Sequence, residues 1–170
     1  MNLTNRMRNS FVVTTLIALL APGCALAEKL DCSGSKMSKQ EVSAQSIKPG
    51  DRPDRELVQV VRIDVLSSKN PEFDGTEQTV YIHLDHIGGT GTHSGYAVNT
   101  TTSGEKLWAK FEGAHYFVPK GGDAWELPYV GTYHYIAGTG KYKAIRGGGY
   151  YRGMVTPAGA TEEFVCEAEY

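Results

Sequence analysis

The chain has 170 residues, with 17 lysines and arginines against 19 aspartates and glutamates, which gives a net charge of −2 at pH 7. This length suits one domain built around one hydrophobic core. A slightly acidic chain does not attract a phosphate backbone, so the composition argues against nucleic acid as a partner.

The first predicted element is an export signal over residues 1–27. Arg6 and Arg8 precede a short apolar run, Phe11–Leu20, and Ala25-Leu26-Ala27 fits a signal-peptidase site. The apolar run is too short to span a bilayer, so no membrane span is predicted. We therefore expect an exported protein that is periplasmic or extracellular.

The three cysteines bear on the same question. Cys24 offers an alternative, a lipid anchor, which we disfavour because Ala21-Pro22-Gly23 lacks the bulky aliphatic residue of a lipobox. Cys32 and Cys166 lie near the two ends of the mature chain, and in an oxidising compartment they are expected to form a disulfide. A catalytic thiol is the alternative, but neither cysteine has an activating base nearby in the sequence.

Residues 28–55 are expected to form a polar leader of irregular structure that carries Cys32. The segment Pro49–Pro53 breaks any regular element there. From residue 56 to 170 the period-2 alternation of β-strands dominates, and no long stretch has a helical period. The predicted strands are Glu56–Leu66, Thr79–His86, Gly95–Thr101, Glu105–Val118, Trp125–Ala137, Gly148–Thr156 and Thr161–Tyr170.

The domain over residues 56–170 is therefore predicted to be all-β, an eight-stranded antiparallel up-and-down barrel of the calycin type. Short strands at even spacing, joined by Gly- and Pro-containing turns, are typical of a sandwich or a barrel. Closure favours the barrel because it leaves no edge strand exposed. A barrel of about eight strands has room for its own side chains or for one small ligand.

A glycine-rich turn precedes the last two predicted strands. Its distinctive residues are Gly138, Gly140 and Tyr142, followed by Arg146 and Gly147. We expect the glycines to supply positive φ angles and Arg146 to hydrogen-bond carbonyls within the turn. A phosphate-binding loop is excluded, because Gly140-Lys141 is followed by Tyr142 and a strand instead of Ser or Thr and a helix.

Three features together resemble the allene-oxide-cyclase-like barrel superfamily, which includes dirigent proteins and small secreted bacterial proteins. They are this turn, the strand Val80-Tyr81-Ile82-His83 followed by Asp85, and the pair Cys32 and Cys166. The resemblance implies an eight-stranded barrel, a trimer, and an apolar cavity at one end. Members of this superfamily cyclise a bound hydrophobic substrate, or direct its coupling, without a cofactor. Here Leu84 separates His83 from Asp85, whereas the dirigent pattern has these two residue types adjacent.

Tyrosines recur within the predicted strands, and a buried tyrosine needs a partner for its hydroxyl, which suits a partly polar cavity wall. The candidate ligand-binding residues are Tyr81, His83, Tyr133 and Tyr135. His83 and Asp85 are then the candidate catalytic residues, as the groups placed for proton transfer. The alternative is that the tyrosines reflect strand propensity on the barrel exterior or at a subunit interface.

His83 and Asp85 share one strand face, and with a third ligand they match the outline of a facial metal triad. The third ligand could come from His93, His115 or His134. A solvated surface is the preferred interpretation of these histidines, so neither a metal nor a cofactor is predicted.

Binding of a small hydrophobic or aromatic molecule in the barrel is the preferred function. One alternative is a cofactor-free cyclase or isomerase of the allene-oxide-cyclase type, which a titratable group with a perturbed pKa in the cavity would favour. The other is a structural or interaction barrel without a ligand, which an interior packed solid by aliphatic side chains would favour.

Overall fold

The computed structural model of the chain describes residues 28–170. The predicted signal peptide and Cys24 lie outside the described residues. Within these residues, no helix has the length and apolar character needed to cross a bilayer.

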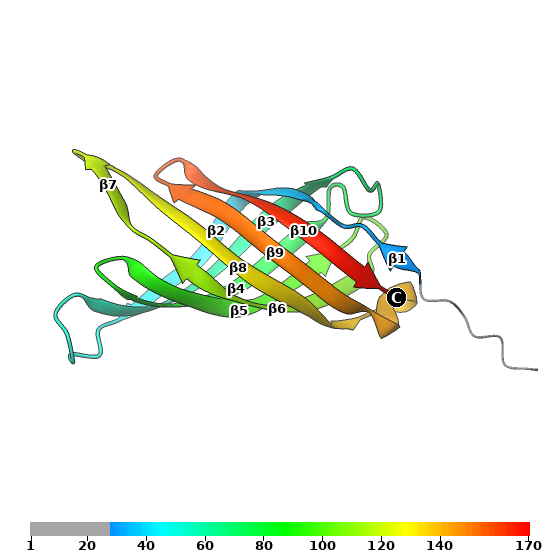
Figure 1. Cartoon of the computed structure of the whole chain (residues 1–170), viewed down its shortest axis with the longest axis horizontal. Helices are drawn as coiled ribbons and strands as arrows, with labels where there is room; N and C mark the ends of the chain where they lie inside the picture. Colours follow the sequence, from blue (N-terminus) through cyan, green and yellow to red (C-terminus); the bar gives the residue numbers. More distant parts are fainter. Residues whose placement is uncertain (1–27) are drawn as a thin grey trace, which may run out of the picture.

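Eight antiparallel strands close into an up-and-down barrel, as predicted (Figure 1). Each strand pairs with the next along the chain, and the last strand pairs back on the first, which closes the barrel. The barrel strands are β2 (Gly34–Ile47), β3 (Arg55–Ser68), β4 (Glu77–Ile87), β5 (Thr90–Thr100), β6 (Lys106–His115), β8 (Ala124–Gly138), β9 (Arg146–Thr156) and β10 (Gly159–Glu169).

Three short elements extend the barrel. Strand β1 (Lys29–Leu30) pairs with the end of β10, and β7 (Val118–Gly121) forms a hairpin with the start of β8. A 3-10 helix, η1 (Gly140–Ala144), joins β8 to β9. Figure 1 shows β1, η1 and the C-terminus at one end of the barrel and the β7 hairpin at the other.

The prediction of an irregular leader over residues 28–55 is wrong, because 14 of these residues form barrel strand β2. The sequence conceals this strand for two reasons. Register shifts interrupt the pairing with β3 at Ser38/Gln40 and Glu41/Ser43, so the alternation of side chains is broken twice. From Lys39 onward every β2 residue is exposed, so the strand carries no apolar face.

All of the strands predicted between residues 56 and 170 are present. The start of β5 is the largest difference, since this strand begins at Thr90 and not at Gly95. Gly88 and Gly89 have φ angles of +59° and +77°, which is the geometry of a two-residue hairpin turn, so β4 leads directly into β5.

One end of the barrel is closed by packed side chains. The loops after β3 and β5 and the helix η1 all lie at this end, because alternate connections of an up-and-down barrel share an end. The buried side chains at this end are Phe73 from the loop after β3, Leu107 from the start of β6 and Tyr142 from η1, each exposed by 1% or less. Cys32 and Cys166 lie beside this cluster at disulfide-bonding distance, with their Cα atoms 5.1 Å apart, which is the pairing predicted from the sequence.

The glycine-rich turn supports this closed end. Gly140 and Gly147 have φ angles of +55° and +102°, as expected for glycines that supply a left-handed backbone. The Tyr142 ring lies 4.9 Å from that of Tyr170, and its hydroxyl donates to Glu72 Oε2 at 2.8 Å. The role predicted for Arg146 is wrong, because it pairs with the Glu169 carboxylate at 3.0 Å.

Candidate functional site

The barrel encloses a cavity of about 470 Å³. The cavity extends toward the end opposite the packed cluster, where Trp125, Thr156 and Pro157 line it. The wall is incomplete there, because β2 pairs with β10 only over Gly34–Met37. The outer half of β2 therefore continues beyond its pairing with β10 and is held on that side of the barrel by β3 alone.

Most of the cavity wall is aliphatic or aromatic. Its apolar lining includes Val60, Val80, Ile82, Leu84, Ala97, Ala109, Phe111, Leu127, Tyr129, Tyr133, Tyr135, Tyr151, Val155 and Phe164. Two glycines make room for the rings, since a Cβ at Gly131 would overlap the Tyr151 hydroxyl and a Cβ at Gly153 would overlap the Tyr129 ring. The two tyrosine rings can therefore lie across the neighbouring strand only because the glycines on β8 and β9 have no side chain there.

Two of the four predicted ligand-binding residues line the cavity, namely Tyr133 and Tyr135. The other two assignments are wrong, because Tyr81 and His83 are exposed on the outer face of β4. Successive residues of a strand point to opposite faces, and on β4 the inner face is the aliphatic one, with Val80, Ile82 and Leu84.

The predicted proton-transfer role is also wrong for Asp85, which faces outward. Its carboxylate accepts two hydrogen bonds from Arg55, at 2.7 and 3.0 Å, and this guanidinium holds the pKa of Asp85 below its usual value. Asp85 is thus engaged in a surface ion pair on the side of the wall away from the cavity.

The histidines do not assemble into the metal triad considered from the sequence. His83 and His134 are exposed, whereas His93 and His115 are buried and line the cavity. Within residues 28–170, no group of three or more His, Cys, Asp or Glu side chains is arranged to hold a metal ion.

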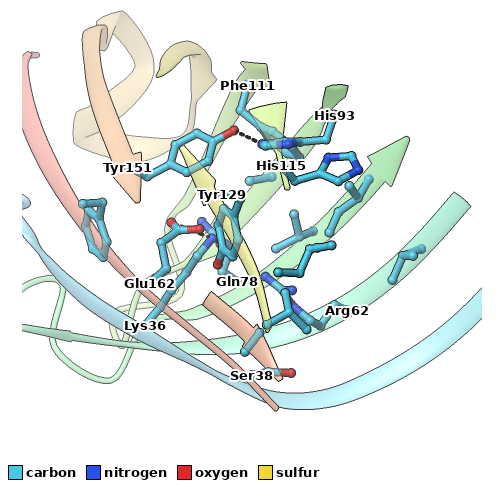
Figure 2. A pocket seen from close by; sticks show the side chains of 18 of the residues that line it. Lys36, Ser38, Arg62, Gln78, His93, Phe111, His115, Tyr129, Tyr151 and Glu162 are labelled. Carbon is cyan, nitrogen blue, oxygen red and sulfur yellow. Dashed lines mark hydrogen bonds and ion pairs between the residues drawn. The ribbon is translucent and has the colours of Figure 1, made fainter. Parts of the chain in front are cut away.

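A charged network that the sequence analysis missed lies along the cavity wall formed by β2, β3, β4 and β10 (Figure 2). Lys36 Nζ lies 3.1 Å from Glu162 Oε1 and 3.6 Å from Asp64 Oδ2, and it donates to Gln78 Oε1 at 2.6 Å. Arg62 donates two hydrogen bonds to Asp64, at 2.7 and 2.9 Å. Two cations therefore balance two carboxylates, and each ion has a partner.

A histidine–tyrosine pair lies above this network (Figure 2). His93 Nε2 and the Tyr151 hydroxyl are 2.7 Å apart. Burial raises the pKa of the Tyr151 phenol, whereas burial, followed by the proximity of His115 and Lys36, lowers the pKa of His93 to about 4. Tyr151 therefore donates the hydrogen bond to a neutral imidazole at pH 7.

We expect acidification from pH 6.5 toward pH 4 to destabilise the fold through His93. The unfolded chain takes up a proton near pH 6.5, but folded His93 does so only near pH 4, so stability present above pH 6.5 is lost as the pH falls. The loss amounts to about 3 kcal/mol by pH 4. Urea denaturation at several pH values measures it, and His93→Phe should flatten the dependence whereas exposed His134→Phe should not. An equally steep dependence in His93→Phe would contradict this assignment.

The missed site residues carry only weak signals in the sequence. Arg62 and Asp64 alternate with valines and isoleucine on β3, and this pattern does not reveal which face is inside. Lys36 lies in the segment expected to be irregular. The pairing of β2 with both β3 and β10 brings it within reach of Asp64 and Glu162, and this pairing is a long-range property of the fold.

The sequence matches no model of a known protein family, and a search of curated proteins finds no match. The similarity to allene-oxide-cyclase-like barrels therefore depends on the motif residues named above. A barrel architecture alone does not identify a family or an activity.

Proposed function

We propose that this protein binds a small, mainly apolar molecule inside its barrel. The cavity of about 470 Å³ carries the proposal, because its volume falls within the range of about 300–1,000 Å³ that is usual for small-molecule sites. Its aliphatic and aromatic walls gain free energy when they are covered, at about 25 cal/mol per Å² of apolar surface removed from water.

The electrostatics of the wall favour a ligand without a net charge. Lys36 and Arg62 are both paired with Asp64 or Glu162, so within residues 28–170 no buried lysine or arginine of the cavity is left over for an anionic ligand. An anion entering the cavity would lose its hydration without gaining a free cationic partner, which is unfavourable in a low-dielectric interior. We propose a neutral ligand that an exported protein meets outside the cytoplasm, since the cysteine pair at bonding distance suits an oxidising compartment.

A substitution that fills the cavity tests this proposal. Ala109 lines the cavity and is 3% exposed, whereas Ala137 on the paired strand β8 is exposed. With N-phenyl-1-naphthylamine as a neutral fluorescent probe, we expect Ala109→Leu to weaken binding at least about tenfold, because the added methyl groups take up space that the probe needs. Ala137→Leu is the matched control and should bind as the native protein does. Equal affinities for all three proteins, or no binding to the native protein, would contradict the proposal.

A cofactor-free isomerase or cyclase is the second candidate function. The observation that favours it is that the cavity contains titratable groups, the Glu162 carboxylate and the His93–Tyr151 pair. Such groups can transfer a proton to a substrate that the walls hold in one conformation. Once a bound compound is known, its conversion to an isomer should be measured with the native protein and with Glu162→Gln.

A structural barrel without a ligand is the weakest of the three candidates, because it requires a solidly packed interior. The resemblance to allene-oxide-cyclase-like barrels and the trimer that it implies stay proposals. Native mass spectrometry, which counts copies directly, tests the trimer.

A further inference from the structure

One polar side chain of the cavity lacks a partner among residues 28–170. His115, the last residue of β6, is 1% exposed, and neither its Nδ1 nor its Nε2 atom makes a hydrogen bond within the part of the chain that the structure describes. It lines the cavity beside Phe111 and His93, as Figure 2 shows. An unsatisfied buried polar group costs about 1–3 kcal/mol, so such a group is rarely left unpaired without a reason.

The neighbouring histidines do not satisfy His115. The His93 ring centroid lies 5.7 Å away, and its Nε2 atom is already occupied by the Tyr151 hydroxyl. The His86 ring meets His115 edge-on at 5.6 Å, and its Nε2 atom lies 3.6 Å from the Glu56 carboxylate. Neither neighbour hydrogen-bonds His115, so the hydrogen-bonding capacity of both of its nitrogen atoms is unused within the described chain.

His115 differs in this respect from the other buried polar side chains of the cavity. Ion pairs or hydrogen bonds join four of these side chains to one another, namely Lys36, Glu162, Gln78 and Asn99. Thr76 Oγ1 is also buried without a partner in the described chain, but it does not line the cavity. Within residues 28–170, His115 is thus the one buried side chain of the cavity wall whose nitrogen or oxygen atoms have no hydrogen-bond partner.

We propose that His115 is the polar anchor of the cavity and that it hydrogen-bonds a hydroxyl or carbonyl oxygen of an otherwise apolar ligand. The inference rests on the proposed binding function and specifies the ligand class as an alcohol, phenol or ketone. Burial, followed by the proximity of His86, lowers the pKa of His115, so its ring is neutral at pH 7. A neutral imidazole has one N–H donor and one acceptor nitrogen, so it can donate to a carbonyl or hydroxyl oxygen or accept from a hydroxyl group.

Two probes that differ only in one hydroxyl group test the anchor, namely 2-naphthol and naphthalene. The readout is the ratio of their affinities, because changes in cavity shape alter both affinities together. We expect His115→Phe to reduce the preference for 2-naphthol about tenfold, which corresponds to one hydrogen bond inside a protein. His115→Gln, which keeps a donor and an acceptor, should retain part of the preference. His83→Phe, on the outer face of β4, should leave the ratio unchanged.

A second measurement needs no substitution. Addition of 2-naphthol should shift the imidazole ¹⁵N resonances of His115 in the native protein, whereas naphthalene should leave its nitrogens in their unbonded state. An unchanged ratio in His115→Phe, or ¹⁵N shifts that are the same with both probes, would overturn the anchor while naphthalene binding still supports the cavity. Failure of both probes to bind the native protein would overturn the anchor together with the proposed function.

Discussion

Replacement of both Cys32 and Cys166 by alanine is expected to lower the free energy of unfolding by about 4 kcal/mol. The two cysteines are separated by 134 residues, and their bond ties the segment before β2 to β10. A covalent link across so long a stretch reduces the conformational entropy of the unfolded chain, and this effect grows with the number of residues enclosed. Urea denaturation of the native and double-alanine proteins gives the difference directly.

Reduction of the native protein is the control for this prediction. Dithiothreitol should move the denaturation midpoint of the native protein to that of the double-alanine variant and should leave the variant unchanged. Free thiols in the unreduced native protein, or equal midpoints for the two proteins, would show that the pair does not stabilise the barrel covalently.

Replacement of Lys36 by methionine is expected to cost about 3 kcal/mol of stability. The Lys36 and Glu162 side chains are 10% and 7% exposed, and Lys36 is the cation that neutralises Glu162 inside the barrel. Its loss leaves a buried carboxylate without a counter-ion, which is more destabilising than the loss of the ion pair as a whole. Chemical denaturation at pH 7 measures the effect.

The double variant Lys36→Met/Glu162→Gln separates charge imbalance from simple loss of contacts. It removes both charges, so it should recover most of the stability lost in Lys36→Met, and the two substitutions should therefore be strongly non-additive. Arg152→Met is the surface control, since the Arg152–Glu163 pair is 73% and 67% exposed and its loss should leave the midpoint unchanged. Additive effects in the double variant would mean that the charges do not interact as the structure indicates.

Most of the fold could be predicted from local patterns. The alternation along β3, β4, β6 and β8 and the glycine-containing turns between strands identify an antiparallel barrel, because each such signal is contained within a few neighbouring residues. Strand β2 could not be predicted in this way. Its pairing with β10 joins residues that are far apart in the sequence, and its exposed outer half, which pairs irregularly with β3, has no apolar periodicity.

The candidate site was predictable only in part. Tyr133 and Tyr135 were placed correctly in the cavity, but the inner face of β4 was assigned to its polar residues, Tyr81 and His83. The reverse holds on β3, where the polar residue Arg62 lines the cavity and its partner Asp64 is fully buried. The register of the whole sheet decides which face of a barrel strand points inside. Where part of the interior is polar, the polar face of one strand points inward, whereas its neighbours still turn their apolar faces inward.

Native mass spectrometry of the protein, purified from its own source without a metal-affinity step, tests ligand binding in the barrel most directly. We expect the native protein and Ala137→Leu to carry an additional organic mass that Ala109→Leu lacks, because Ala109 faces the cavity and Ala137 does not. A native protein that carries no added mass, and that gains none when it is incubated with N-phenyl-1-naphthylamine, would contradict the claim that this barrel binds a small apolar molecule.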